Sequence, residues 1–579
     1  MRIREVTIEK FRSIKKASFR MKEITAVVGE NNAGKTAVLR ALNAVLNYEF
    51  EKDSFDRKLH QFLPRNNTHI IVTFDDIPTR DFYNDYIYDD SLMIEFSYSY
   101  SDNKKRYYVH KGREKISIDD FFMNELSKDI KYVYIPAGRT NKDVRWGEES
   151  IFRELITEYT AHYTENRDTI SSYVRKATDK IHDSVLTKLE KQINELYMQN
   201  QSMDFKIGFP TGLDYTVLLE NIELSLNENG LNYLLQEWGS GTKSLAVIAM
   251  HRANALLKSG SIVLGIEEPE TNLHPQAQKR FIMSLRKQLH DNETQTIFTT
   301  HSTVLVDALE HEEIILVRKN NAINADLTRG FISEISQLPN DFWEKYDIEE
   351  FKHYQYFNYK NSEFFFSKYV VVGESKNDIQ VFEKLVTPEL GNKIADVSFL
   401  DAGGIEQIRY PYFLLKELNI PFVLVVDRDF FFEYQNDSLE ESRNPINGLP
   451  FYKDIMKENV VLKDIFKTQT GIQELQAAHA KGYRKFFEYI KQYNILSMNY
   501  CLEMDLTCSK KARELYYSIL NVIPANQTQR YILTTHNKAI KKIDKILKIL
   551  DTIPKTSYPE AYTKIKKAII DDINIKIGN

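Results

Sequence analysis

The stretch Gly29-Glu30-Asn31-Asn32-Ala33-Gly34-Lys35-Thr36 decides the fold of the first half of this chain. It follows an apolar run at 24–28 and precedes a helical pattern at 37–42. A strand, a glycine-bounded loop and a helix in this order indicate a phosphate-binding loop, although a turn without a ligand is the alternative for so short a motif. The Lys35 ammonium would reach the outer phosphates and the Thr36 hydroxyl would hold Mg²⁺. The residues predicted to surround the phosphates are Gly29, Asn32, Gly34, Lys35 and Thr36.

The composition limits the class of protein. At 579 residues the chain is too long for one core, and about 150 residues per domain predicts three or four units. Only Cys501 and Cys508 occur, which excludes a disulfide framework and a four-cysteine zinc site and favours a reducing cytoplasm. No apolar run approaches the roughly 20 residues that span a bilayer, and the start lacks a signal-peptide core. We therefore expect a soluble cytoplasmic protein without membrane contacts.

The charge is unevenly distributed. A net charge of −5 argues against a protein that coats nucleic acid. Residues 538–579 nevertheless carry ten lysines against five acidic residues. The apolar residues Ile540, Ile543, Leu547 and Leu550 recur at helical spacing, which places them on one face of an amphipathic basic helix. Both a solvated lysine face and a surface that follows phosphates are consistent with this pattern.

The first half alternates between strand and helix signals. Apolar alternation in residues 1–28 predicts an edge hairpin that leads into the phosphate-loop strand, and the patterns at 69–74, 92–100 and 106–110 predict an antiparallel sheet. A further strand at 131–135 ends shortly before Arg139, which either faces a nucleotide or a partner or lies in an ordinary surface loop. Strand character is expected again between 205 and 226.

Residues 148–200 form a separate region. They lack strand signals, proline and glycine and are densely charged, which predicts an inserted pair of helices. Ile151, Leu155, Tyr159 and Tyr163 would share one helical face. This face makes the insertion a candidate dimerisation arm, and packing onto its own domain is equally consistent.

Three motifs after residue 237 complete a nucleotide-site pattern. The stretch Trp238-Gly239-Ser240-Gly241 opens a helix and offers a second anion site at its N-terminus. The buried strand 261–266 ends in Glu267 and Glu268, an arrangement that suits Mg²⁺ binding and polarisation of water. The strand 295–300 delivers His301, which can sense a terminal phosphate.

The second half places acids after predicted parallel strands. Glu374 and Asp378 follow the strand 368–373, and Asp427 and Asp429 follow the strand 421–426. Such acids converge at the carboxyl edge of a parallel sheet. Divalent metal would relieve their repulsion, and oxygen ligands favour Mg²⁺ or Mn²⁺ over zinc. Capping of the following helix is the alternative for Glu374 and Asp378.

The motifs of the first half resemble the ABC-type ATPases related to the RecF and SMC families. Phe11-Arg12-Ser13 also resembles the N-terminal motif of that group. The resemblance implies that Glu267 supports the metal, Glu268 is the hydrolytic base, and Ser240 with Gly241 closes the site from a second head. The family's glutamine loop has no clear match, and Gln61 is the residue we compare with it.

The acids of the second half resemble the Toprim domain of topoisomerases, primases and nucleases. Ser375 stands where the family's Glu-Gly-x-x-Asp motif has glycine. An ABC-type ATPase followed by Toprim resembles, over essentially the whole chain, the overcoming-lysogenisation-defect (OLD) nucleases, which include the Gabija nuclease and retron-associated effectors. The resemblance implies two-metal hydrolysis of DNA with Lys538 as the stabilising cation, Lys541 and Lys542 competing for this role. The implied metal ligands or their supports are Glu374, Asp378, Asp427, Asp429, Glu503 and Asp505.

These observations predict an α/β fold with an ABC-type P-loop ATPase domain at 1–147 and 201–345. The helical insertion occupies 148–200, and the Toprim domain with basic C-terminal helices occupies 346–579. We expect an ATP-regulated DNA endonuclease or nickase that forms a homodimer or larger homo-oligomer and serves antiphage defence. The family also admits a retron reverse transcriptase with its nucleic acid, or a helicase, as partner. An ATP-switched clamp that cuts nothing is the alternative, and a topoisomerase is a third option.

Overall fold

The computed structural model divides into two compact units. The first comprises Met1–Val27, Gly34–Leu305 and Asn320–Glu334, and the second comprises Val28–Ala33, Val306–Lys319 and Ile335–Asn579. The structure describes residues 1–63, 66–140, 142–143, 145, 147, 150–162, 167–196, 206–207, 209, 215–220, 222, 224–228, 230–234, 237–257, 260–288, 294–320, 330–348 and 362–577. Among them, no helix has the length and apolar character needed to cross a lipid bilayer.

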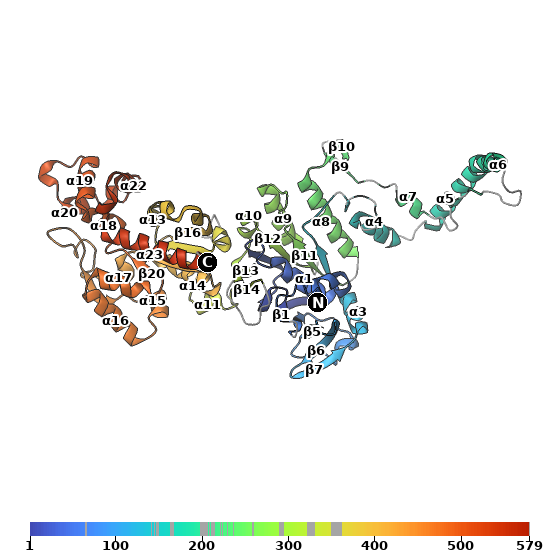
Figure 1. Cartoon of the computed structure of the whole chain (residues 1–579), viewed down its shortest axis with the longest axis horizontal. Coiled ribbons are helices and arrows are strands. Elements are labelled where there is room, and N and C mark those ends of the chain that lie inside the picture. Colours follow the sequence, from blue (N-terminus) through green and yellow to red (C-terminus); the bar gives the residue numbers. More distant parts are fainter. Residues whose placement is uncertain are drawn as a thin grey trace. The chain divides into compact units, whose positions relative to one another are not determined.

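A twelve-stranded sheet is the framework of the first half (Figure 1). Its order is β7-β6-β5-β4-β1-β2-β14-β13-β3-β12-β11-β8. From β7 to β2 the strands pair antiparallel, whereas β12, β11 and β8 are parallel. In this order the strands are Glu114–Ile118, Lys104–Lys111, Leu92–Ser99, Thr68–Asp75, Arg2–Phe11, Ile14–Arg20, Ile332–Ser336, Ile314–Asn320, Ile24–Gly29, Thr294–Thr300, Ser261–Glu267 and Ile130–Ile135.

The strands predicted at 69–74, 92–100, 106–110 and 131–135 are all present as β4, β5, β6 and β8. The N-terminal hairpin is also present, but its predicted position at the sheet edge is wrong. β4 pairs with the free side of β1, and Ser333 of β14 pairs with Ile14 of β2. These partners come from distant parts of the sequence, so local alternation could not reveal them.

Buried apolar strands position the residues that follow them. Every residue of β3 and of β11 is buried, which is the pattern of strands covered on both faces. Helix α1 begins directly after the phosphate-loop motif and buries one apolar face. The helices of this region are α1 Lys35–Leu46, α2 Tyr48–Glu51, α3 Asp120–Asp129, α8 Ser240–Leu257, α9 Pro275–Gln288 and α10 Thr303–Val306.

The insertion is helical, as its charge and periodicity predict. Ile151 of its first helix is buried in a cluster with Trp238 and Val247, so this helix packs on its own domain. The next helix, α5, buries none of its residues. Tyr159 is 47% exposed, and Tyr163 lies outside the described residues. The elements are α4 Ile151–His162, α5 Arg167–Ile181, a π-helical turn His182–Leu186 and α6 Thr187–Leu196.

The strand expected between 205 and 226 is mostly wrong. Within the described part of this range, Thr216–Leu219 forms the short helix α7. Strand structure begins only at Ser225, in the hairpin of β9 Ser225–Glu228 and β10 Leu231–Leu234. Residues 205, 208, 210–214, 221 and 223 lie outside the described residues, so the prediction is not tested there.

The second unit contains a four-stranded parallel sheet of order β16-β15-β17-β20. The strands are β15 Tyr369–Gly373, β16 Val397–Asp401, β17 Phe422–Val426 and β20 Ile495–Ser497. Between β17 and β20 the chain forms a hairpin of β18 Phe432–Tyr434 and β19 Tyr452–Met456. The helices are α11 Phe342–Lys345, α13 Lys376–Leu390, α14 Arg409–Glu417, α15 Val460–Ile465, α16 Gln469–Ala480, α17 Tyr483–Lys491, α18 Leu502–Cys508, α19 Lys510–Ile519, α20 Gln529–Thr535, α21 Asn537–Ile540, α22 Ile543–Thr552 and α23 Glu560–Ile577.

The C-terminal helices complete the core of this unit. Their buried residues include Ile540, Leu550, Ile565 and Ile569, which join the same cluster as the central strands. The apolar face predicted for the basic tail is therefore buried, but it is divided between α21 and α22 rather than carried by one helix. Both cysteines are free thiols.

Candidate functional site

The phosphate-loop motif is held between β3 and α1. Gly34 has φ of 104°, a left-handed conformation that favours glycine. A Cβ atom at Gly34 would lie 2.3 Å from Ser333 Oγ and 2.9 Å from Ser13 Oγ, so the position is closed to larger residues. Lys35 follows at the helix start and is only 6% exposed. The loop thus has the glycine and the buried lysine that a phosphate cradle needs.

The predicted acids and histidine of the first unit gather near Lys35. Glu267 ends β11, and Glu268 follows with its carboxylate 3.8 Å from His301 Nε2. Burial lowers the pKa of His301, and the nearby Lys35 charge lowers it further. A neutral imidazole beside Glu268 and Lys35 can accept or donate a hydrogen bond at this end of the sheet.

Glu268 has an unusual backbone. Its φ is 40°, a left-handed value that costs of order 1–3 kcal/mol for a residue with a side chain. Its N–H donates to the Thr299 carbonyl at 3.0 Å and to Thr299 Oγ1 at 3.1 Å. The side chain remains 43% exposed. The strain therefore belongs to a residue whose carboxylate is available to a ligand.

Arg139 and Glu270 belong to the same cluster. Arg139 Nη2 donates to the main-chain carbonyls of Glu267 at 2.6 Å and Glu268 at 2.7 Å, so it is not an ordinary loop residue. Glu270 Oε1 accepts from Thr300 Oγ1 and from the His301 N–H, and burial raises the pKa of Glu270. No role was predicted for Glu270, although it belongs to the same acidic run.

The other predicted nucleotide residues are less directly connected. Ser240 is exposed at the start of α8, and a Cβ atom on Gly241 would lie 2.5 Å from the Asn272 carbonyl. Gln61 Oε1 accepts from the Phe331 N–H at 2.9 Å, so its amide already bonds to the main chain. The comparison of Gln61 with a glutamine loop stays a prediction.

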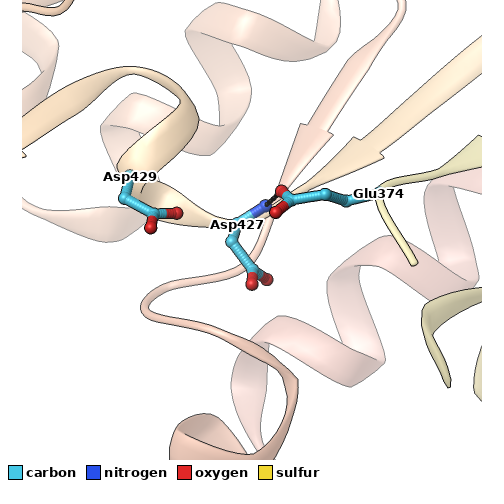
Figure 2. Close-up of side chains that lie close together, drawn as sticks. All are labelled: Glu374, Asp427 and Asp429. Carbon is cyan, nitrogen blue, oxygen red and sulfur yellow. Dashed lines mark hydrogen bonds between the residues drawn. The ribbon is translucent and has the colours of Figure 1, made fainter. Parts of the chain in front are cut away.

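Glu374, Asp427 and Asp429 come together at the carboxyl edge of the second sheet. Each offers one carboxylate oxygen, and these oxygens lie within 4.8 Å of one another. Figure 2 shows the Glu374 carboxylate accepting from the Asp427 main-chain N–H, a bond of 3.3 Å. β15 delivers Glu374 and the adjacent β17 delivers the Asp-x-Asp pair, so the parallel register creates the cluster.

Burial and mutual repulsion disfavour ionisation here. Burial, followed by the Asp429 charge, raises the pKa of Glu374 to about 7. Burial also raises the pKa of Asp427 well above its ordinary value, with Asp378, Glu374, Asp429 and Glu503 contributing. Asp427 Oδ1 is buried and lacks a hydrogen-bond partner among the described residues. An orphaned carboxylate oxygen within an acidic cluster fits a divalent cation with oxygen ligands.

Asp378 lies beside this cluster and also caps a helix. Its Oδ2 accepts from the Ser375 N–H at 2.9 Å and from Ser375 Oγ at 2.7 Å, forming a capping box at the start of α13. Ser375 at the usual glycine position therefore supplies the N-cap. Burial raises the pKa of Asp378 to about 6, and Glu503 and Asp401 add to the shift. The capping alternative thus holds for Asp378.

Glu503 and Asp505 lie on α18, beyond the end of β20, rather than at the strand end. Asp505 Oδ2 accepts hydrogen bonds from the N–H groups of Asn499 and Tyr500, and these bonds stabilise the turn between β20 and α18. Burial raises the pKa of Asp505 to about 7. Glu503 instead points to the cluster, since its charge acts on both Asp378 and Asp427.

Lys541 places a positive charge beside one of these acids. Its Nζ lies 3.3 Å from Glu503 Oε1, and the charges of Glu503 and Asp427 raise its pKa. Lys538 is exposed, and its main-chain N–H donates to Asn537 Oδ1. The geometry therefore favours Lys541 over Lys538 among the lysines that the sequence left in competition.

Three neighbours of the cluster were not predicted. Tyr434 Oη donates to Asp429 Oδ2 at 3.0 Å, the Lys457 charge acts on Glu374, and Asp401 ends β16 opposite Gly373. Tyr434 and Lys457 belong to the hairpin region after β17, where no local motif marks them. The run Val397-Ser398-Phe399-Leu400 before Asp401 predicts a strand, so the position of Asp401 at a strand end was the one available signal.

Comparisons with known proteins agree with this division. The family model described as "AAA domain, putative AbiEii toxin, Type IV TA system" matches residues 24–307. The model described as "Overcoming lysogenization defect protein-like, TOPRIM domain" matches residues 365–429. The predicted fold class, a P-loop ATPase domain followed by a Toprim domain, is confirmed.

Relatives resemble the chain across both halves. The OLD nuclease of Thermus scotoductus is 24% identical over 465 residues, covering 74% of this chain and 82% of that protein. The Old nuclease of Escherichia phage P2 is 24% identical over 473 residues, covering 74% and 78%. The endonuclease GajA of Bacillus cereus is 22% identical over 358 residues, covering 56% and 59%.

Among solved structures, an Smc head bound to the C-terminal winged-helix domain of ScpA aligns with a TM-score of 0.37 and 15% identity. It covers 60% of this chain and 100% of that chain. The predicted resemblance to the OLD group is confirmed by the two family models and by the named nucleases.

Proposed function

Because an AAA-type ATPase domain followed by an OLD-like Toprim domain makes this chain a relative of the OLD nucleases, we propose that it is an ATP-regulated, metal-dependent DNA endonuclease or nickase. The single observation that carries the proposal is the meeting of Glu374, Asp427 and Asp429 at one sheet edge. Three buried carboxylates without a cation to neutralise them destabilise the folded protein, so a cluster of this kind indicates a bound ion or a role in a reaction.

The acidic cluster fits Mg²⁺ or Mn²⁺. Glu374, Asp427 and Asp429 would hold the ion, with Glu503 and Asp378 beside them. A bound ion would supply neutralisation of charge on the phosphodiester and activation of water. Tyr434 orients Asp429, and the Asp427 N–H orients Glu374. Lys541 places a positive charge close to Glu503, where it can stabilise negative charge on the DNA backbone.

The nucleotide site would control this activity. Lys35 and Thr36 would bind the phosphates and Mg²⁺ of ATP, Glu267 would support that ion, and Glu268 would accept the proton of the attacking water. Ser240 is exposed at the start of α8, as a residue that meets a second head must be. We therefore propose a homodimer whose ATP state changes the access of DNA to the Toprim site.

Purified protein tests the nuclease directly. Supercoiled plasmid should be nicked in Mg²⁺ or Mn²⁺, and Asp427→Ala and Asp427→Asn should abolish nicking while ATP binding survives. Asp437→Ala removes an exposed aspartate of the same unit and should leave nicking intact. Nicking that persists in both Asp427 variants would overturn the site. Absence of nicking by the wild type in either metal, with ATP binding intact, would favour the clamp without nuclease activity.

The biological role rests on family resemblance. We propose antiphage defence, and the test is the efficiency of plating of a phage panel on cells that express the wild type or Asp427→Ala. Protection by the wild type alone would support the role, whereas equal plating throughout the panel would count against it. None of the relatives reported above is named as a reverse transcriptase or a helicase, so the proposal includes neither partner.

A further inference from the structure

Arg139 lies within the acidic end of the ATPase unit although it is not part of a recognised motif. It follows β8, which pairs in parallel with β11 and so ends beside Glu267. A single nitrogen, Nη2, donates to the carbonyls of Glu267 and Glu268 at 2.6 and 2.7 Å. Among the described residues, Nε and Nη1 are buried without hydrogen-bond partners. Among the described residues, the guanidinium therefore donates its hydrogen bonds to two successive main-chain carbonyls.

These two carbonyls flank the left-handed residue of the site. Thr299 binds the Glu268 N–H, and Arg139 binds the Glu268 carbonyl. The backbone of Glu268 is thus fixed on both sides at φ of 40°. A residue in a sparsely populated conformation persists only where its surroundings determine it. Without Arg139, one of the two anchors of this conformation is lost.

The conformation of Glu268 decides where its carboxylate lies. In the structure the carboxylate is 3.8 Å from His301 Nε2, and Lys35 acts on the same histidine. If the backbone relaxed to an ordinary right-handed or extended conformation, the side chain would leave from a different direction. The carboxylate would then move away from His301 without any change in the histidine itself.

We propose that Arg139 is a positioning residue for ATP hydrolysis, because its bonds to the Glu267 and Glu268 carbonyls hold the Glu268 carboxylate in place to accept a proton from the attacking water. This inference rests on the proposed ATPase function and extends it to a residue outside the motifs. Arg139 acts through the main chain of Glu268, so its loss should slow hydrolysis without weakening nucleotide binding.

Arg139 also carries a positive charge, and the effect of this charge on hydrolysis must be distinguished from the effect of its hydrogen bonds. The three acids Glu267, Glu268 and Glu270 all act on the Arg139 charge. Arg139→Lys keeps the charge and places an ammonium whose three N–H groups can donate to both carbonyls, as the single nitrogen Nη2 does. Arg139→Gln keeps a terminal N–H₂ donor but loses the charge. If positioning is the role, both should be impaired less than Arg139→Ala.

The first experiment measures ATPase rate and ATP affinity on the full chain. Misplacement of a catalytic group costs up to roughly 100-fold, so kcat of Arg139→Ala should fall by about 10- to 100-fold. The dissociation constant for ATP should change by less than about twofold. A lower kcat with an unchanged dissociation constant indicates that the lost group acts on the reaction and not on binding. Arg113→Ala removes an exposed arginine of the same unit and should match the wild type.

The second experiment asks whether Arg139 acts through Glu268. Single-turnover hydrolysis is compared for Glu268→Gln with and without Arg139→Ala. Residues that act as a unit are non-additive, so the second substitution should change the residual rate by less than about twofold. A loss equal to that seen in the wild-type background, or a weakened ATP affinity, would overturn the proposal and indicate direct contact with the phosphates.

Folding and function controls keep the outcomes distinct. If Arg139→Ala does not fold, Arg139→Met, which keeps the length of the side chain and removes every donor, is used for both experiments, and an unchanged kcat in a folded Arg139→Met would count against the proposal. Failure of the wild type to hydrolyse ATP would instead refute the proposed ATPase function. Nicking by the wild type is measured separately, because the nuclease does not depend on this inference.

Discussion

At the scale of the residue, the acids of the second unit lie close together, and their negative charges repel one another. Glu374, Asp427 and Asp429 cannot all ionise cheaply at such short separations, and burial adds to the cost. Their types and order were predictable because an Asp-x-Asp after an apolar strand is a local pattern. Tyr434 was not predictable, because it reaches Asp429 only through the fold of the hairpin after β17.

Tyr434 allows a test of how Asp429 is held. Tyr434→Phe removes the hydrogen bond to Asp429 Oδ2 and keeps the ring. Loss of an outer partner of a metal ligand typically weakens metal affinity by roughly 10- to 100-fold. We expect nicking to require correspondingly more Mn²⁺ and to recover at saturation, as a metal titration of the nicking rate would show.

Tyr452→Phe is the matched control for this substitution. Tyr452 stacks on Tyr434 with ring centroids 5.4 Å apart, and no bond from its hydroxyl to Asp429 occurs among the described residues. Its Mn²⁺ requirement should equal that of the wild type. An equal shift in both variants would mean that the stacked pair, and not the hydrogen bond, supports the site.

The raised pKa values predict how pH affects the metal-free protein. Glu374 and Asp505 have pKa values of about 7, against ordinary values of 4.5 and 3.8. The folded form therefore holds more protons than the unfolded form between these limits, and stability falls as pH rises from about 4 to 7. In EDTA, the melting temperature of the Toprim unit should be lower at pH 8 than at pH 5.5, by about 2–4 °C per kcal/mol.

Metal should reverse this trend. Mn²⁺ competes with protons for the carboxylates, so it should raise the melting temperature more at pH 8 than at pH 5.5. Asp429→Asn removes a charge that raises the pKa of Glu374 and should flatten the pH dependence. Asp437→Asn, at an exposed position, should leave it unchanged. A melting temperature that rises steadily with pH in EDTA would contradict the prediction.

At the scale of the element, the strand ends were easier to predict than what surrounds them. The runs that became β3, β11, β15 and β17 are apolar throughout and lead directly into the site residues. The position of β1 inside the sheet depends on pairing with β4, about 60 residues away in the chain. Such distant partners leave no local signal, which is why the hairpin was expected at an edge.

The short helix α21 separates the two lysines that compete for a role beside the acids. Lys541 follows this helix and lies 3.3 Å from Glu503, whereas Lys538 is exposed at its start. Loss of a group that stabilises transition-state charge costs roughly 100- to 1,000-fold in rate. Lys541→Ala should therefore reduce nicking by at least tenfold, and Lys538→Ala should reduce it by less than about threefold.

The two lysine variants control for each other because they remove the same charge a few residues apart. Nicking rates under saturating Mg²⁺ are the measurement. If Lys538→Ala were the more damaging substitution, the original prediction from family resemblance would stand and the geometric preference for Lys541 would fall. Equal small effects would assign neither lysine to the reaction.

At the scale of the whole molecule, the sequence predicted two activities in one chain, and the family models match both halves. The assignment was possible because both sets of motifs occur in the expected order. How ATP state and cutting are connected was not predictable, because the coupling proposed here acts through a second copy of the chain. The insertion remains a candidate for that contact, with α5 burying none of its residues and α4 packed on its own domain.

Head pairing can be tested on the full chain. Glu268→Gln should bind ATP without hydrolysing it and so accumulate the paired state. Size-exclusion chromatography with light scattering should show an ATP-dependent increase in mass. Ser240→Arg, placed at an exposed helix start, should prevent the increase in that background and leave ATP affinity within about twofold. A mass independent of ATP in both proteins would mean that pairing relies on other surfaces.

The capping box of α13 has a consequence beyond the start of one helix. Asp378 fastens the first turn of α13 through Ser375 and at the same time faces the acids around Asp427. A cation that attracts this carboxylate competes with the amide of Ser375 for the same oxygen. Binding of the ion would therefore favour fraying of the helix start. The rate at which the Ser375 amide exchanges with deuterium would then report the fraction of molecules that have an ion bound.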